Sequence, residues 1–203
     1  MNHRRKKLPI VLEPREAGSL LKQPNKRYLT GLRDKAILFL MLDVGLRVSE
    51  VANLKPSDVN LTEGKLRVIN GKGGVDRELF LSDFIIYLLR EWKERKPKST
   101  EYFFTTLKDK KEGKFTCKPG KRLAVRNIQF MVKKYAKKAG IDKIISPHTL
   151  RHSFATEYYR QTKDLETLRM VLGHSSIMTT QIYVTLANID VENGMKSFKG
   201  FEG

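Results

Sequence analysis

Apolar residues recur every three or four positions along most of this chain, which is the spacing of one helix face. A first helix is expected over residues 14–22, because proline is favoured in a first helical turn and Pro24 follows the last turn. Thr30 is expected to cap a second helix, whose apolar positions repeat until Gly45. A third helix is expected over residues 48–54. The chain therefore begins as a set of short helices.

The apolar spacing changes from helical to alternating between residues 65 and 81. Residues 65–68 and 78–81 are expected to form two strands, joined through the glycine-rich turn Gly71-Lys72-Gly73-Gly74. This turn places Lys72 at the tip of a hairpin. Residues 102–105 are a candidate third strand. The whole pattern predicts an α+β fold class, mainly α-helical with a small antiparallel three-stranded sheet.

Helical spacing returns after the hairpin and continues to the end of the chain. Ser82 can cap a long helix that ends before Pro97. Residues 108–122 are rich in Lys and Gly and lack periodic apolar positions, so an exposed loop is expected there, either touching phosphate or simply solvated. Further helices are expected over residues 123–139, 146–160, 165–172 and 175–185, with a last short helix after residue 188.

The net charge of the chain indicates the kind of partner that it binds. Lys and Arg number 40 against 22 Asp and Glu, which gives a formal net charge of +18 and favours a polyanionic partner. Nucleic acid is the first candidate and an anionic membrane surface the second. The longest apolar stretch, residues 36–42, is far shorter than the roughly 20 residues that cross a bilayer, so no membrane association is expected.

The N-terminal residues disfavour a secreted protein, and the cysteine content disfavours a structural zinc site. The basic residues 1–8 are followed by too few apolar residues for a secretory signal, so the chain is expected to stay in the cytoplasm. Cys117 is the single cysteine and can form no internal disulfide. With four scattered histidines it offers no ligand set for structural zinc, so Cys117 is interpreted as an ordinary loop residue.

Candidate chemistry gathers in the last third of the chain. His148 and Arg151 are three apart on the same helix face, and His152 follows at once. His174 comes directly after a helix end, and Tyr183 lies nine positions later. Taken singly, each of these residues is more often a surface or core residue than part of a site. Their joint presence in a basic protein is what makes them candidates.

The motifs occur in an order that resembles the tyrosine recombinases of the phage integrase type. They are Gly45-Leu46-Arg47-Val48-Ser49-Glu50, the hairpin Lys72, His148-x-x-Arg151-His152, Leu172-Gly173-His174 and Tyr183. The resemblance covers residues 8–190 and implies the fold of that family's catalytic domain. It divides the chain into a basic N-terminal extension (1–12), a catalytic domain (13–187) and a tail (188–203). In the family such a tail can pack on a neighbouring subunit, and packing on its own domain is equally allowed.

The resemblance also implies roles for the residues that attack and hold the DNA. Tyr183 attacks a DNA phosphodiester and forms a 3′-phosphotyrosyl bond, with no metal or cofactor. A tyrosine has an ordinary pKa of about 10, so it needs a proton acceptor and a cationic surrounding. Arg47 and Arg151 suit the phosphate because each offers a permanently charged, planar set of donors.

The remaining motif residues are given supporting chemistry by the same resemblance. His148 is the expected proton acceptor for Tyr183, because imidazole changes charge near neutrality. His174 hydrogen-bonds the phosphate, and Lys72 protonates the leaving 5′ oxygen. Glu50 braces Arg47. Apart from the resemblance, His152 is expected to be a structural residue that packs behind the site. The bland alternatives are a surface ion pair for Arg47 and Glu50 and a solvated turn residue for Lys72.

The function implied is a site-specific recombinase that acts on double-stranded DNA as a homo-oligomer, a tetramer, in the cytoplasm at the nucleoid. An accessory recombination protein is a further candidate partner. A type IB topoisomerase is disfavoured because, by the same resemblance, topoisomerases carry a lysine at the position where this chain has His148. A non-catalytic DNA-binding regulator is disfavoured by the intact motifs, and a metal-dependent nuclease by the lack of a carboxylate cluster. Family members commonly carry a further N-terminal domain, so this chain is expected to be either an excised catalytic domain or a naturally short enzyme.

Overall fold

The computed structural model describes residues 8–69, 76–98, 100–107, 110–111, 114–115 and 118–197. The predicted residues Lys72 and Cys117 lie outside this set. The helices are α1 (Pro14–Lys22), α2 (Leu29–Leu42), α3 (Val48–Asn53), α4 (Asp83–Arg95), α5 (Val125–Lys138), α6 (Pro147–Thr162), α7 (Leu165–Leu172) and α8 (Ile182–Ser197). The strands are β1 (Val59–Asn60), β2 (Lys65–Val68), β3 (Arg77–Phe80), β4 (Lys110–Lys111) and β5 (Lys114–Phe115).

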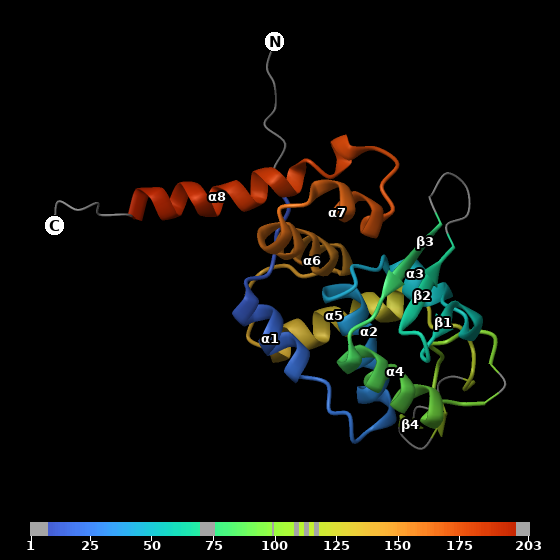
Figure 1. Ribbon diagram of the computed structural model, residues 1–203. Coiled ribbons are helices and arrows are strands. Elements are labelled where there is room, and N and C mark those ends of the chain that lie inside the picture. The colour runs from blue at the N-terminus through green and yellow to red at the C-terminus, as the bar shows by residue number, and fades with distance from the viewer. Residues whose placement is uncertain are drawn as a thin grey trace, which may run out of the picture.

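The predicted fold class is confirmed: helices dominate, and a three-stranded antiparallel sheet in the order β1-β2-β3 lies beside them (Figure 1). Leu66 pairs with Leu79, and Val68 pairs with Arg77. The side chains of Leu66, Val68 and Leu79 are buried, as the alternation of apolar residues requires. Arg77 lies in the last β2–β3 pair before the connecting residues 69–76, and it is on the inward face of β3, next to the helices.

The third strand of the sheet is β1, and the prediction of a strand at residues 102–105 is wrong. Phe103 and Phe104 are fully buried. The backbone N–H of Phe103 donates to the Leu54 carbonyl, and its own carbonyl accepts from the Trp92 indole at 2.9 Å. Because these partners use its backbone groups, the segment does not join the sheet, and Thr105 forms only an isolated bridge with Arg122.

Two helix predictions are also corrected. The second helix starts at Leu29 after Tyr28, so Thr30 lies inside the first turn and does not cap it. The predicted helix over residues 175–185 is a short 3₁₀ turn, Ile177–Thr179, followed by the start of α8. The Ser176 hydroxyl accepts from the backbone N–H of Met178 and so begins this separate turn. The helix expected after residue 188 is the continuation of α8.

Helix α6 lies between two apolar clusters, and this position organises the candidate site (Figure 1). The larger cluster surrounds α2 and includes the fully buried Leu32, Ile37 and Met41. The smaller cluster joins α6, α7 and α8 and includes Leu168, Leu172 and Tyr183. The first turns of α6, the start of α3 and the end of α7 meet near the place where the two clusters adjoin.

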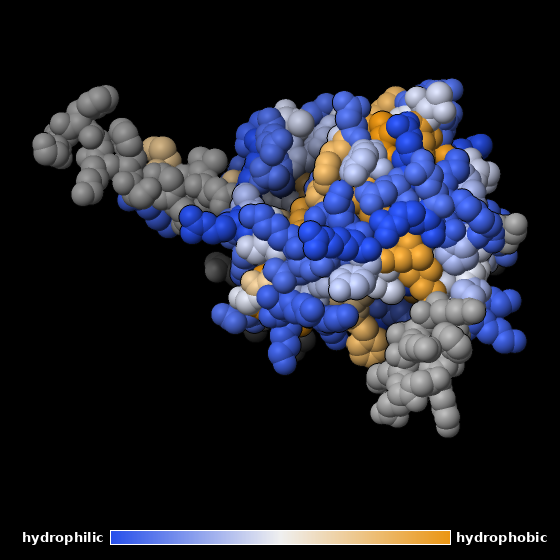
Figure 2. Space-filling model, turned by 90° about the horizontal axis from the view of Figure 1, so that it is seen from below, coloured by the Kyte–Doolittle hydropathy of each residue, from blue (hydrophilic) through white to orange (hydrophobic). Residues whose placement is uncertain are grey.

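The outer surface is largely polar. Figure 2 shows a mostly hydrophilic face on which apolar side chains form separate patches. Within the described part of the chain, no helix combines the length and the apolar character needed to cross a membrane.

Candidate active site

Arg47 is placed by the tight turn between α2 and α3. Gly45 has a φ of +72°, and a Cβ there would lie 2.3 Å from the Phe154 ring, so only glycine fits. Arg47 is the residue before the first turn of α3, and its backbone N–H donates to Glu50 Oε2 at 2.7 Å. Its guanidinium Nη1 donates to Glu50 Oε1 at 2.9 Å. The Arg47 side chain keeps 32% of its surface exposed and can reach a ligand.

Glu50 is buried and binds more than one arginine. Arg77 donates to both of its carboxylate oxygens, at 3.0 and 2.9 Å, and Arg151 Nη1 lies 3.9 Å from Oε2. Burial raises the pKa of the Glu50 carboxyl. The hydrogen bonds and charge of Arg77, the backbone N–H of Arg47 and the charge of Arg151 together lower it by more, so this pKa lies below its ordinary value. Glu50 thus hydrogen-bonds Arg47, and it also binds Arg77, a partner that the sequence analysis missed.

The alternation of residues along β3 could have indicated that Arg77 is buried. It alternates with Leu79, a buried residue, so it falls on the inward face of β3. A charged residue on an inward face needs a buried partner of opposite charge. Glu50 is such a partner in the same motif region, but one sequence without the helix packing does not pair the two.

Arg151 is buried and held by two backbone carbonyls. Nη1 donates to the carbonyl of Gly45 at 2.5 Å, and Nη2 donates to that of Leu172 at 2.6 Å. Burial, and then the charge of Arg47, lower the pKa of Arg151 to about 10, so it stays a cation at neutral pH. Nη2 also lies 3.5 Å from Nε2 of His174. Arg151 therefore connects the α2–α3 turn to the end of α7.

His174 is fixed at the turn that ends α7. Gly173 adopts a left-handed conformation with φ +61°, which ends the helix and directs His174 toward Arg151. His174 Nδ1 lies 3.0 Å from the Thr180 hydroxyl. Burial, and then the charge of Arg151, lower the pKa of His174 to about 4, so its ring is neutral at pH 7.

Tyr183 is 2% exposed, and its hydroxyl lies 3.0 Å from Nδ1 of His152. Burial raises the pKa of Tyr183, while the charges of Arg151 and Arg47 lower it in part. Burial, and then the charge of His148, lower the pKa of His152, which favours the neutral form of its ring. His152 was expected to pack behind the site, and the structure places it against the tyrosine. His148 lies exposed at the start of α6.

A single cavity of about 630 Å³ collects the predicted residues. Two arginines, three histidines and the tyrosine line it, together with part of the segment 178–182. These residues are Arg47, His148, Arg151, His152, His174 and Tyr183. Cationic and hydrogen-bonding groups around a phenol can hold a phosphate diester beside a nucleophile. Of the residues with predicted catalytic roles, Lys72 alone cannot be placed, because it lies outside the described residues.

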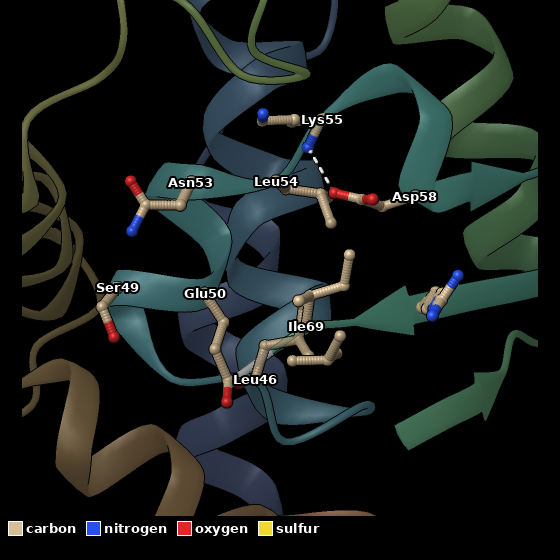
Figure 3. Close-up of a pocket in the computed structure, with 10 residues that line it drawn as sticks. Leu46, Ser49, Glu50, Asn53, Leu54, Lys55, Asp58 and Ile69 are labelled. Carbon is tan, nitrogen blue, oxygen red and sulfur yellow. Dashed lines mark hydrogen bonds between the residues drawn. The ribbon is translucent and has the colours of Figure 1, made fainter. Parts of the chain in front are cut away.

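A second cavity of about 460 Å³ shares Glu50 with this site (Figure 3). Ser49, Asn53 and Lys55 line it from α3 and the following turn, and Arg67 lines it from β2. In Figure 3 the Glu50 side chain points away from Asn53 and Lys55. The Glu50 carboxylate therefore binds the arginines, while the polar residues of α3, Ser49 and Asn53, line the second cavity.

Acidification is expected to destabilise the fold through His174. Its pKa in the folded chain is about 4, against 6.5 for the ordinary group, so between these values the unfolded chain binds a proton that the folded chain does not. Stability should therefore fall as the pH is lowered from 7 toward 5. Urea denaturation at both pH values measures this, and a His174→Gln variant should show a smaller drop. An equal drop in the variant would mean that His174 is not held in its neutral form.

Comparison with known proteins places these observations in a family. The model described as the phage integrase family matches residues 11–188. Over 194 residues the chain is 37% identical to tyrosine recombinase XerD of Staphylococcus epidermidis, covering 95% of this chain and 63% of that protein. The crystal structure of XerA recombinase matches with a TM-score of 0.75 at 30% identity, covering 92% of this chain and 66% of that one.

A further match is the XerH site-specific recombinase bound to a palindromic difH substrate in a post-cleavage complex. Its TM-score is 0.74 at 28% identity, covering 94% of this chain and 54% of that one. The chain thus spans less than two thirds of the length of these relatives. Because the family model matches nearly the whole chain and the fold agrees, this chain belongs to the phage integrase family of tyrosine recombinases.

Proposed function

We propose that this chain is the catalytic domain of a site-specific DNA recombinase, which breaks and rejoins strands of duplex DNA through Tyr183. The observation that carries the proposal is the cavity in which the tyrosine hydroxyl, two arginines and three histidines meet. Support also comes from the net charge of +18, which suits a polyanion, and from XerH, whose structure is a complex with its difH substrate. The proposed catalytic domain spans residues 13–187.

The proposed reaction transfers the DNA strand to the tyrosine. The Tyr183 oxygen attacks the scissile phosphorus, a 3′-phosphotyrosyl bond forms, and the bond to the 5′ oxygen breaks. Arg47 and Arg151 stabilise the negative charge that builds on the non-bridging oxygens. His174 donates a hydrogen bond to the same phosphate. Attack by the 5′ hydroxyl of another strand on the phosphotyrosine reverses these steps and restores Tyr183.

The protons need two further groups. Nδ1 of His152 lies 3.0 Å from the Tyr183 hydroxyl, so we propose that His152 accepts the phenolic proton first. His148 lies four residues earlier on the same helix face, lines the same cavity and is proposed to pass this proton on or to contact the phosphate. Lys72 remains our proposed donor to the leaving 5′ oxygen. Tyr183 is 2% exposed, and we propose that the segment 178–182, which lines the same cavity, moves as the phosphate binds.

Assembly on DNA belongs to the same proposal. Helix α8 extends past the rest of the molecule in Figure 1, and Met195 on it is 69% exposed. A helix that leaves its own domain can pack on a neighbouring copy, which suits a homo-oligomer, proposed as a tetramer, with the tail 188–203 at its contacts. The proposed location follows the substrate: the cytoplasm, at the nucleoid, where an accessory recombination protein is a candidate partner.

The test is covalent capture on nicked duplexes, in which the strand downstream of the cut diffuses away and the adduct accumulates. A library of nicked duplexes with a randomised core avoids the need to know the target sequence. We expect an adduct that survives boiling in detergent, forms equally in EDTA and returns one enriched sequence. Binding without any adduct would favour a non-catalytic regulator. Relaxation of a supercoiled plasmid that lacks the enriched sequence would favour a topoisomerase.

A further inference from the structure

We propose that Arg77 is a positioning residue for the phosphate-binding arginines and for His174, an inference that rests on the proposed function. Arg77 begins β3 and pairs with Val68 across the hairpin. Its side chain is only 5% exposed. It is therefore placed to act on other residues of the site, not on DNA.

The first contact of Arg77 is with Glu50, and through it with Arg47. The two guanidinium Nη atoms of Arg77 bind the two carboxylate oxygens at 3.0 and 2.9 Å, in the side-by-side geometry of a strong ion pair. The same carboxylate holds both the backbone N–H and the side chain of Arg47. A change in the position of Glu50 is thus passed directly to Arg47.

The charges around Glu50 explain why Arg77 matters for the other two arginines. Glu50 carries one negative charge, and Arg47, Arg77 and Arg151 all lie within 4 Å of its oxygens. Arg77, whose side chain is 5% exposed and binds both carboxylate oxygens, neutralises the carboxylate. Without it, Glu50 would attract Arg151 and Arg47 more strongly and turn them away from the cavity. Arg77 therefore leaves the charges of the other two arginines free for the phosphate.

The second contact of Arg77 is with the end of α7. Its Nε donates to the carbonyl of Val171 at 2.6 Å, and Arg151 donates to the next carbonyl, that of Leu172. A Cβ on Gly173 would lie only 3.0 Å from Arg77 Nη1, so the turn packs directly on the guanidinium. The following residue is His174. One planar group thus sets the distance between Glu50 and the His174 turn, which a lysine with a single ammonium cannot do.

The main experiment compares Arg77→Lys and Arg77→Gln with the unchanged chain in single-turnover cleavage at saturating DNA. Misplacement of the reacting groups is expected to slow cleavage by about 100-fold. DNA affinity, measured by fluorescence anisotropy, should stay within about threefold, since Arg77 is buried and makes no phosphate contact of its own. A loss seen only in affinity would overturn the proposal.

A substrate with a methylphosphonate at the scissile position separates positioning from general damage. Its neutral methyl group replaces one charged oxygen, so a correctly placed arginine pair matters less. The penalty of the Arg77 variants should fall to about tenfold or less on this substrate. An equal penalty on both substrates would mean that Arg77 only supports the fold, and it would overturn the proposal.

Arg33→Lys is the matched control. Arg33 also binds a carboxylate, that of Asp34 at 2.8 Å, and a backbone carbonyl, that of Thr105 at 3.1 Å. Its side chain is similarly buried, at 13% exposed. We expect this variant to lose stability and to keep its cleavage rate. If Arg77→Gln fails to fold, Arg77→Lys keeps the charge and carries the comparison.

A measurement that needs no cleavage distinguishes failure of this inference from failure of the proposed function. In the Arg77 variants the ring signals of His174, observed by ¹H–¹⁵N NMR, should shift and broaden, because the turn that holds it has lost a partner. The Arg33→Lys variant should leave them unchanged. Unaltered His174 signals in both Arg77 variants would overturn the proposal even for a chain that forms no adduct.

Discussion

The Tyr183→Phe variant is expected to form no covalent adduct and to give no strand cleavage. Phenylalanine fills the same buried space but has no oxygen to attack the phosphorus, so the loss should be complete. The fold should survive, because the variant gives up one hydrogen bond, that to His152, worth about 1 kcal/mol. DNA binding should remain, since the arginines are untouched. Denaturing gel electrophoresis on nicked duplexes, with anisotropy for binding, measures both.

Tyr135→Phe is the control for this result. Tyr135 is also buried, and its hydroxyl donates to Asp34 at 3.1 Å. Removing it takes away a tyrosine oxygen and one hydrogen bond, as in the first variant, but outside the cavity. We expect a small loss of stability and an adduct yield equal to that of the unchanged chain. Adduct formed by Tyr183→Phe would show that another residue is the nucleophile.

Arg151→Lys is expected to lower the cleavage rate by about a thousandfold at saturating DNA. A lysine keeps the charge, but its one ammonium cannot reach the carbonyls of Gly45 and Leu172 and still meet the phosphate. The buried carbonyls left without a donor should also reduce the free energy of unfolding by roughly 1–3 kcal/mol.

Single-turnover cleavage and urea denaturation measure the two effects of this substitution separately. Cleavage is assayed well below the denaturation midpoint, so a folded variant that cleaves slowly reports on the phosphate contact and not on unfolding. A folded Arg151→Lys variant with the unchanged rate would remove Arg151 from the reaction.

Local signals in the sequence account for most of the helices. Ser82 accepts a hydrogen bond from the backbone N–H three residues later, as predicted for a helix cap, and Ser146 does the same at the start of the predicted helix over residues 146–160. Gly173 ends α7 in the left-handed conformation. The strand expected at 102–105 failed for a tertiary reason. Its aromatic residues fit a strand, but the backbone path is determined by burial of Phe104 against Trp92 and by the hydrogen bond from the Trp92 indole to the Phe103 carbonyl.

The candidate site was predictable where a motif marks each residue in order, as for Arg47, Arg151 and Tyr183. The contacts between motifs were not. His152 meets Tyr183 only because α6 packs on α8, and Arg77 meets Glu50 only because the start of β3 packs on α7 close to α3. Such pairs join residues far apart in the chain, and periodicity within one segment carries no information about them.

The measurement that tests the central claim most directly is the identity of the residue that carries the DNA. The captured adduct is digested with nuclease and trypsin, and the peptides are fragmented in a mass spectrometer. Cleavage after Arg169 and Lys196 releases residues 170–196, in which Tyr183 is the only tyrosine. We predict a nucleotide joined through its 3′ phosphate to Tyr183 in this peptide. The same mass on any other residue would contradict the account.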